Sequence, residues 1–87
     1  MEIYREVLQR HGVKNSIFTM VLLAMCEYGM DYGEALGAVA EFKRLDPELL
    51  HSQVCYWLLA AGTEEHPTRW FARLVNEVEE MEEQDAD

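Results

Sequence analysis

The apolar segment IFTMVLLAMCEY at residues 17–28 restricts the fold of this chain more than any other segment. Its spacing predicts a helix with apolar side chains on nearly every side, so most of the helix surface must be covered. The longest apolar stretch, residues 17–26, contains Thr19 and is too short to cross a bilayer. The chain has 87 residues, enough for one domain with a single modest core. We therefore expect this helix to lie at the centre of the domain, or to be covered partly by another molecule.

The other segments also follow the helical period of 3.6 rather than the strand period of 2. Ser16 can cap the helix at 17–28. Asp31 and Glu34 have the spacing of a capping box. Asp46 followed by Pro47 marks another helix start. We predict an all-α fold, a compact four- to five-helix domain with short connections, with helices at about 2–11, 17–28, from 32 onward, 47–61 and 67–81.

The helix that begins after Asp31 carries two stripes of residues at helical spacing. The apolar stripe comprises Ala35, Val39 and Phe42, and the stripe of small residues comprises Gly33, Gly37 and Ala40. Glycine inside a helix costs about 1 kcal/mol, and we expect close packing of another helix to be the reason for it here, a partner groove being the alternative. The helix at 47–61 has its core spacing at Leu50, Val54, Trp57, Leu58 and Ala61.

The net charge of −10 is unevenly distributed. Residues 1–76 contain seven basic and ten acidic residues, a balance of −3, whereas residues 77–87 contain seven acidic residues and no basic one. Non-specific binding of nucleic acid requires clustered Lys and Arg, so direct nucleic-acid binding is disfavoured. A basic protein partner is favoured, although acidity also serves solubility.

The acidic C-terminal end divides into two parts. Val78 and Met81 continue the apolar stripe of the last helix, so we expect residues 1–81 to form a single helical domain. Acidic residues are disfavoured at a helix C-terminus by the helix dipole. We therefore predict that residues 82–87 form a frayed, solubilising tail.

The two cysteines, Cys26 and Cys55, both lie in apolar runs and do not make a disulfide framework. This usage, together with a first segment that lacks an apolar signal core, predicts a cytoplasmic protein without a membrane segment. His51 and Cys55 are four residues apart on one helix, and Cys26 and His66 could complete a metal site. Because no CxxC or HxxxH motif is present, we expect the cysteines to be core residues, with no metal and no cofactor.

No arrangement typical of an enzyme is present in the sequence. The two serines, Ser16 and Ser52, are explained as a helix cap and a helix-face residue, and neither lies in a G-x-S-x-G motif. No glycine-rich phosphate loop is present. The carboxylates of the C-terminal end lack the burial that shifts the pKa of a catalytic acid. We therefore expect no enzymatic activity and no catalytic residue.

Residues 17–44 also fit a helix-turn-helix, with YGEALGAVAEFKR as the recognition helix. Its exposed side chains would be Tyr32, Glu34, Glu41, Lys43 and Arg44. Base reading favours Arg, Lys, Asn or Gln near the start of the recognition helix, and this helix begins with acidic residues. A DNA-binding regulator is therefore a disfavoured alternative.

The stretch GMDYGEALGAV at 29–39, followed by VCYWLL at 54–59, resembles a ubiquitin-associated domain. That family has a Met-Gly-Phe-type loop, a helix with an E-A-L-x-A-L pattern and a third helix ending in a W-L-L-like run. The matching residues here are Tyr28, Gly29, Met30, Glu34, Ala35, Val39, Trp57, Leu58 and Leu59. The resemblance implies a three-helix module over about 20–60 that binds a partner through residues 28–30 and the end of its third helix. The loop aromatic is missing, and the helices at 2–11 and 67–81 have no counterpart in the family.

Aromatic and basic residues cluster in HPTRWFARL at 66–74. Arg69 and Arg73 are four residues apart, and Glu65 and Glu77 continue the same face at either end. A ladder of i,i+4 ion pairs is the expected arrangement. The alternative is a partner anchor, because Trp, Phe and Arg are common at binding hot spots. The adjacent Trp70 and Phe71 point about 100° apart, so one can enter the core while the other covers its edge or faces a partner.

The sequence favours a small acidic protein-binding protein, an inhibitor or modulator that occupies a surface of a larger protein. Small acidic phage-type antagonists have this size and charge, and the chain could block a nucleic-acid-binding surface by mimicry. The acids offered for mimicry are Glu27, Asp31, Glu34, Glu41, Asp46 and Glu48, interrupted by Lys43 and Arg44. A homodimeric structural or assembly protein is the alternative. The candidate partner-binding residues are Tyr28, Met30, Tyr32, Glu34, Glu41, Arg69, Trp70, Phe71 and Arg73.

Overall fold

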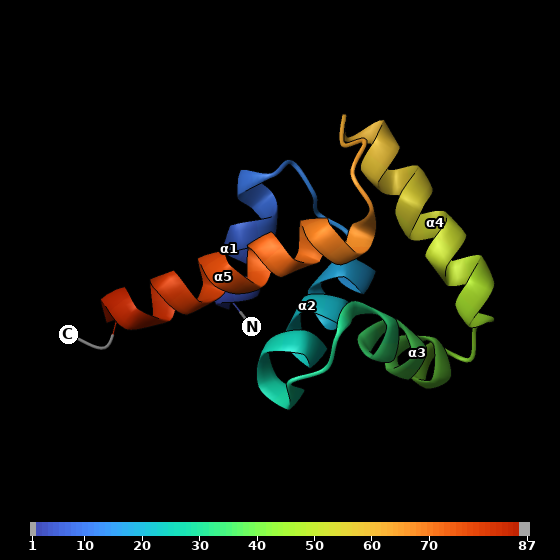
Figure 1. Ribbon diagram of the computed structural model, residues 1–87, viewed down its shortest axis with the longest axis horizontal. Helices are drawn as coiled ribbons and strands as arrows, with labels where there is room; N and C mark the ends of the chain where they lie inside the picture. The colour runs from blue at the N-terminus through green and yellow to red at the C-terminus, as the bar shows by residue number, and fades with distance from the viewer. Residues whose placement is uncertain (1, 86–87) are drawn as a thin grey trace.

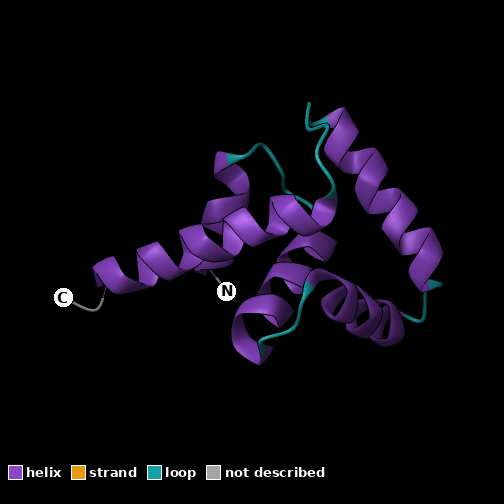
Figure 2. Cartoon of the chain, in the orientation of Figure 1, coloured by secondary structure: helices purple, strands orange, loops and turns teal. Residues whose placement is uncertain are grey.

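A computed structural model describes residues 2–85 and confirms the all-α prediction: these residues form five helices and no strand (Figures 1 and 2). The helices are α1 (Glu2–Arg10), α2 (Ser16–Tyr28), α3 (Tyr32–Lys43), α4 (Pro47–Ala60) and α5 (Pro67–Asp85). The connections between them are short, as in most small helical domains.

Side-chain caps set the starts of the three middle helices. The Glu34 N–H donates to Asp31 Oδ1 at 2.8 Å and the Asp31 N–H donates to Glu34 Oε1 at 3.3 Å, which confirms the capping box of α3. The Glu48 N–H donates to Asp46 Oδ1 at 2.9 Å at the start of α4. At α2 the expected cap was wrong by one residue. Asn15, in an extended conformation, accepts from the Ile17 N–H at 2.8 Å, and Ser16 is already helical.

The core is built around α2, which packs against α1, α3 and α5. Phe18 of α2 is fully buried, and its ring lies 5.6 to 5.8 Å from the rings of Trp57, Trp70 and Phe71. Aromatic pairs at this spacing add to the stabilisation from burial alone. The central position predicted for the 17–28 helix is therefore correct. A second helix, α5, is equally central, because it packs against all four others.

Two expectations about the ends of helices were wrong. The side chain of Phe42, expected in the core stripe of α3, is 74% exposed, whereas Ala35, Leu36 and Val39 are buried. At the other end of the chain, α5 does not stop near residue 81 but continues to Asp85, since Glu and Gln are good helix formers even where the helix dipole opposes them. Residues 86–87 of the tail predicted at 82–87 lie outside the described residues.

Helix α4 packs against fewer helices than α2 or α5 do. It packs mainly against α3 and α5 through Leu50, Val54 and Leu58, which are buried. Figure 1 shows α4 at one edge of the molecule, away from α1 and from the C-terminal half of α5. Within residues 2–85, no helix covers the remaining side of α4.

Candidate functional site

Beyond Glu48 in the first turn, the uncovered side of α4 carries no charge and is mainly apolar. Residues 49–63, LLHSQVCYWLLAAGT, contain no Asp, Glu, Lys or Arg, in a chain in which 28% of residues are charged. Leu49, Tyr56 and Leu59 are 56%, 69% and 62% exposed. We define the outer face of α4 by its exposed residues Leu49, Ser52, Gln53, Tyr56, Leu59 and Ala60. These residues repeat at helical spacing and so line one face of the helix.

Exposed apolar side chains are concentrated at this edge of the domain. Six large apolar side chains of the described residues are exposed, and five of them lie between residues 42 and 59. Phe42 and Leu45 belong to this group; Phe42 lies in the last turn of α3, and Leu45 lies in the connection to α4. Single exposed apolar residues are normal, but a concentration of them marks an interaction site in a soluble protein. This edge is therefore the best candidate for a protein-binding surface.

Carboxylates flank the outer face of α4 at both ends. Asp46 and Glu48 lie at its N-terminal end, and Glu64 and Glu65 follow its C-terminal end. Glu65 is paired with Arg73 of α5. The face is therefore a neutral apolar strip between acidic ends, in a chain whose net charge is −10.

Three of the residues proposed from the sequence as partner contacts are core residues instead. Trp70 is 2% exposed, and Phe71 and Tyr32 are also buried. The expectation that one of the adjacent aromatics stays near the surface is wrong because α5 is packed on several sides. Phe71 stacks on Tyr32 while Trp70 packs edge-on against Phe18, so both faces of α5 are occupied. A partner cannot reach these three rings in the folded chain.

The remaining proposed contacts are not gathered into one surface with α4. Tyr28 is exposed, Met30 is half-buried, and Glu34 and Glu41 are exposed. Figure 1 shows the α2–α3 connection and the C-terminal end of α4 on opposite sides of the molecule. The surface implied by the resemblance to a ubiquitin-associated domain requires these two segments side by side. The fold does not bring them together.

The expected ladder of ion pairs on α5 is also different in the structure. Arg73 pairs with Glu65, which precedes the helix, rather than with Glu77. Glu77 instead contacts His11, whose Nε2 lies 2.9 Å from Glu77 Oε1, and this contact joins the end of α1 to α5. Arg69 is exposed and takes part in neither pair. These contacts are accounted for by helix packing within the chain.

Most of the acids considered for nucleic-acid mimicry have a structural role. Glu27 accepts a hydrogen bond from the Tyr4 hydroxyl. Asp31 and Glu34 form the capping box of α3, and Asp46 caps α4. Only Glu41 and Glu48 of that set lack such a side-chain contact among the described residues. An acidic face dedicated to mimicry is therefore not favoured by the arrangement.

A cluster of polar and aromatic side chains lies where α3, α4 and the start of α5 meet. The Tyr32 Oη lies 2.8 Å from His51 Nδ1, and Cys55 Sγ lies 3.6 Å from His51 Nε2. The His66 ring centroid is 5.7 Å from that of His51, and His66 Nδ1 accepts from the Thr68 N–H at the start of α5. The sequence paired His51 with Cys55, but nothing in it indicated Tyr32, which is 19 positions away.

The residues considered for a metal site are divided between two places. Cys26 is half-buried at the end of α2, where burial, with smaller effects of Glu82 and other acids, raises the pKa of its thiol to about 11. His51, Cys55 and His66 belong to the cluster described above. Within residues 2–85, no three His, Cys, Asp or Glu side chains are arranged to hold a metal ion.

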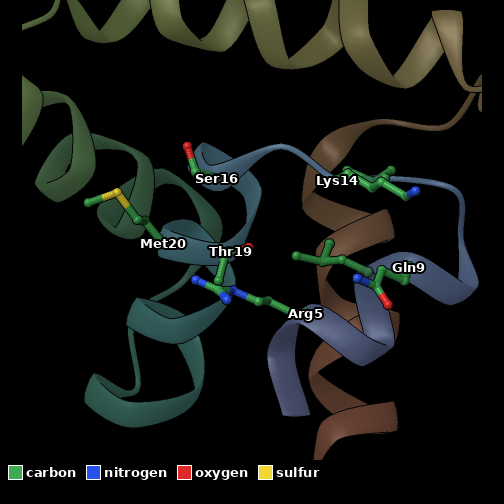
Figure 3. A pocket seen from close by; sticks show the side chains of 8 residues that line it. Arg5, Gln9, Lys14, Ser16, Thr19 and Met20 are labelled. Carbon is green, nitrogen blue, oxygen red and sulfur yellow. The ribbon is translucent and has the colours of Figure 1, made fainter. Parts of the chain in front are cut away.

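A cavity of about 410 Å³ lies between α1 and the start of α2 (Figure 3). Its lining consists of Arg5, Leu8, Gln9, Val13, Lys14, Ser16, Thr19 and Met20. Arg5 and Lys14 are basic, which is unusual in so acidic a chain. Figure 3 shows the Arg5 guanidinium beside Thr19, whereas the Lys14 ammonium points to the opposite side, so the two cations do not converge on one point. The geometry therefore does not define an anion site.

No protein-family model, curated protein or solved structure matches this chain. The ubiquitin-associated resemblance thus stays a hypothesis from the residues alone. None of the helices described in residues 2–85 combines the length and the apolar character needed to span a membrane.

Proposed function

We propose that this chain is a non-enzymatic protein-binding protein, which docks the outer face of α4 into an apolar groove of a larger protein. The observation that carries the proposal is the exposure of Leu49, Tyr56 and Leu59 on a helix stretch without any charged residue. A helix that presents apolar anchors at helical spacing is a recurring recognition element for grooves on other proteins.

The energetics of such docking are favourable for a helix of this kind. Burying one large apolar side chain contributes about 1.5–3 kcal/mol, so three anchors can supply most of a useful affinity. The helix is already folded and capped by Asp46, so binding does not carry the cost of ordering it. Helical spacing predicted five core residues on α4 but did not indicate Leu49, Tyr56 and Leu59 as a shared surface, although the uncharged run was visible.

The charge of the chain favours a partner other than a second copy. At a net charge of −10, two copies repel each other, whereas a groove with Lys and Arg at its rim attracts the acidic ends of the α4 face. Occupying such a groove blocks it for other ligands. We infer that the chain acts as an inhibitor or modulator of its partner, in the manner of phage-type antagonists of similar size and charge.

The test places a photoreactive phenylalanine analogue at Tyr56, with Tyr28 as the matched control, since both are exposed tyrosines on different helices. In the native host, we expect one discrete crosslinked protein from position 56 and none of that species from position 28. Leu49→Glu with Leu59→Glu should abolish the crosslink, and Tyr28→Glu should retain it. Circular dichroism should show unchanged helicity for all variants, because the substituted side chains are exposed.

Binding measurements with the purified partner then test the proposal quantitatively. Calorimetry should show a loss of at least about 100-fold in affinity for the Leu49→Glu, Leu59→Glu variant and a negative heat-capacity change for the wild-type chain. Unchanged affinity of that variant would overturn the proposal. A crosslinked product consisting of two copies of this chain would also overturn it and assign the face to self-association.

A further inference from the structure

The Tyr32, His51 and Cys55 side chains form a chain of contacts typical of an activated nucleophile. Cys55 and His51 are one helical turn apart on α4, which brings Sγ and Nε2 within 3.6 Å. On its other side, His51 Nδ1 lies 2.8 Å from the Tyr32 hydroxyl. A thiol beside an imidazole, with the imidazole oriented by a third group, is the order that nucleophilic sites share.

The third group is held rigidly. Tyr32 is buried, and its ring stacks on Phe71 with the centroids 5.5 Å apart and an interplanar angle of 21°. Burial, with a smaller effect of the nearby Cys55, raises the pKa of the Tyr32 hydroxyl above its ordinary value. The hydroxyl therefore remains neutral, and its oxygen can accept a hydrogen bond from His51 Nδ1.

This geometry suits a thiolate and imidazolium pair. When the Cys55 thiol transfers its proton to His51 Nε2, the imidazolium has two N–H groups to donate. One faces the sulfur and the other faces the Tyr32 oxygen, so both donors have acceptors in place. A thiolate stabilised in this way is the reactive form of cysteine.

A small cavity beside Cys55 has room for a ligand. It has a volume of about 180 Å³ and lies at the connection between α4 and α5. Cys55 borders it, with Leu59 and Pro67 as apolar walls and Thr63, Glu64, Glu65 and His66 as the polar part of its lining. A volume of this size holds a group of a few heavy atoms. Glu65 is paired with Arg73, so the Glu64 carboxylate is the one in the lining that favours a positively charged group.

We propose that Cys55 is a nucleophilic thiol that exchanges with small cationic disulfides and holds the resulting mixed disulfide in this cavity. The thiolate attacks one sulfur of the small disulfide, a new S–S bond forms at Cys55, and the bond between the two original sulfurs breaks. The departing thiolate takes the proton from His51 Nε2 and leaves as a thiol. One disulfide replaces another, so no further oxidant is required. His51 acts on the sulfur directly, and Tyr32 is a positioning residue.

Cys26 provides an internal comparison. It is half-buried, no imidazole contacts it among the described residues, and several acids surround it. We compare Cys26→Ser, in which Cys55 is the remaining thiol, with Cys55→Ser, and follow adduct formation with cystamine by mass spectrometry at neutral pH. Cys55 should react at least about tenfold faster than Cys26, and His51→Gln should slow Cys55 by about tenfold or more. Oxidised glutathione, which is anionic, should react more slowly than cystamine.

Further experiments distinguish activation of the Cys55 thiol by its neighbours from greater exposure of that thiol. In concentrated urea the difference between the two thiols should disappear, because it depends on the fold. Tyr32→Phe keeps the ring and should move the pH of half-maximal rate at Cys55 upward, since the imidazolium loses one acceptor. Two results would overturn the proposal: equal native rates for Cys55 and Cys26, or an unchanged Cys55 rate in a His51→Gln variant whose circular dichroism is native. Equal rates with cystamine and oxidised glutathione would overturn the preference for cationic disulfides.

Discussion

Among single residues, Gly37 lies in the interior of α3, in the stripe of small residues. The sequence predicted that small residues on α3 allow another helix to approach closely. A Cβ placed on Gly37 would meet no atom within 4 Å, so no close approach requires glycine there. The sequence could not show this open space, because the spacing of small residues identifies a stripe on the helix but not the atoms that lie opposite it.

Gly37→Ala should therefore stabilise the chain. Alanine is better than glycine in a helix interior by about 0.5–1 kcal/mol, and α3 has space for the methyl group. Urea unfolding followed by circular dichroism measures the change. Gly29→Ala is the matched control and should destabilise, because Gly29 has a φ of +65°, where a Cβ is strained. A destabilised Gly37→Ala would show that the small-residue stripe is packed after all.

Two buried tyrosines and one cysteine make the stability of the chain sensitive to alkali. Burial, supported by the hydrogen bond to Glu27, raises the pKa of Tyr4, and burial likewise raises the pKa of Tyr32 and of Cys26. A group whose pKa is higher in the folded chain stabilises that chain in its protonated form. The stabilisation is complete below the ordinary pKa values of 9.0 for cysteine and 10.0 for tyrosine, and is lost as the pH rises beyond them.

We therefore expect the free energy of unfolding to be nearly constant from about pH 7 to pH 8.5 and to fall above about pH 9. Urea titrations at several pH values measure it. Tyr4→Phe should give a shallower fall above pH 10, because that variant has one buried hydroxyl fewer to ionise. The same slope in Tyr4→Phe and wild type would contradict the assignment to Tyr4.

For the helices, the residue at which each helix starts was easier to predict from the sequence than the contacts that the helix makes. The capping box of α3 and the Asp46–Pro47 start of α4 were both correct, since capping depends on residues within one turn. Asn15 and Ser16, which are neighbours at the start of α2, have similar intrinsic preference as caps, although only Ser16 was expected in this role. Only the backbone conformation, extended at Asn15 and helical at Ser16, decides between them.

This assignment makes a prediction about α2. Asn15→Ala should lower the free energy of unfolding by about 1 kcal/mol, because the Ile17 N–H loses its acceptor at the end of a central helix. Ser16→Ala should change it by less than about 0.5 kcal/mol, since Ser16 is exposed and makes no capping bond. Chemical denaturation of the two variants side by side tests the pair. A larger loss for Ser16→Ala would reverse the assignment.

For the whole molecule, the large negative net charge affects both solubility and stability. The chain carries −10, and α5 extends through the acidic residues up to Asp85, so the charges of that segment are held along a helix rather than spread by a free tail. Like charges on a compact chain repel one another, and salt screens that repulsion. The acidity therefore favours solubility at a cost in stability.

Adding salt should consequently stabilise the wild-type chain. Raising NaCl from about 0.02 to 0.5 M should increase the melting temperature by about 2–5 °C. Glu82→Gln with Glu83→Gln removes two exposed charges near the end of α5 and should show a smaller increase. Differential scanning calorimetry measures both. An equal response in the two proteins would indicate that the charges of α5 do not contribute to the repulsion.

The sequence alone determined the helical class, the central α2 and most helix starts, because these depend on periodicity and on contacts within one turn. The tertiary structure decided which apolar faces are covered. Trp70 and Phe71 are both buried, whereas Tyr56 and Phe42 are exposed, although all four are large aromatic residues on helices. A core of this size can bury only some of the apolar helix faces, so covering one face leaves another exposed. The local sequence shows which helices have an apolar face. Only the packing of all five helices determines which of these faces stays exposed to solvent.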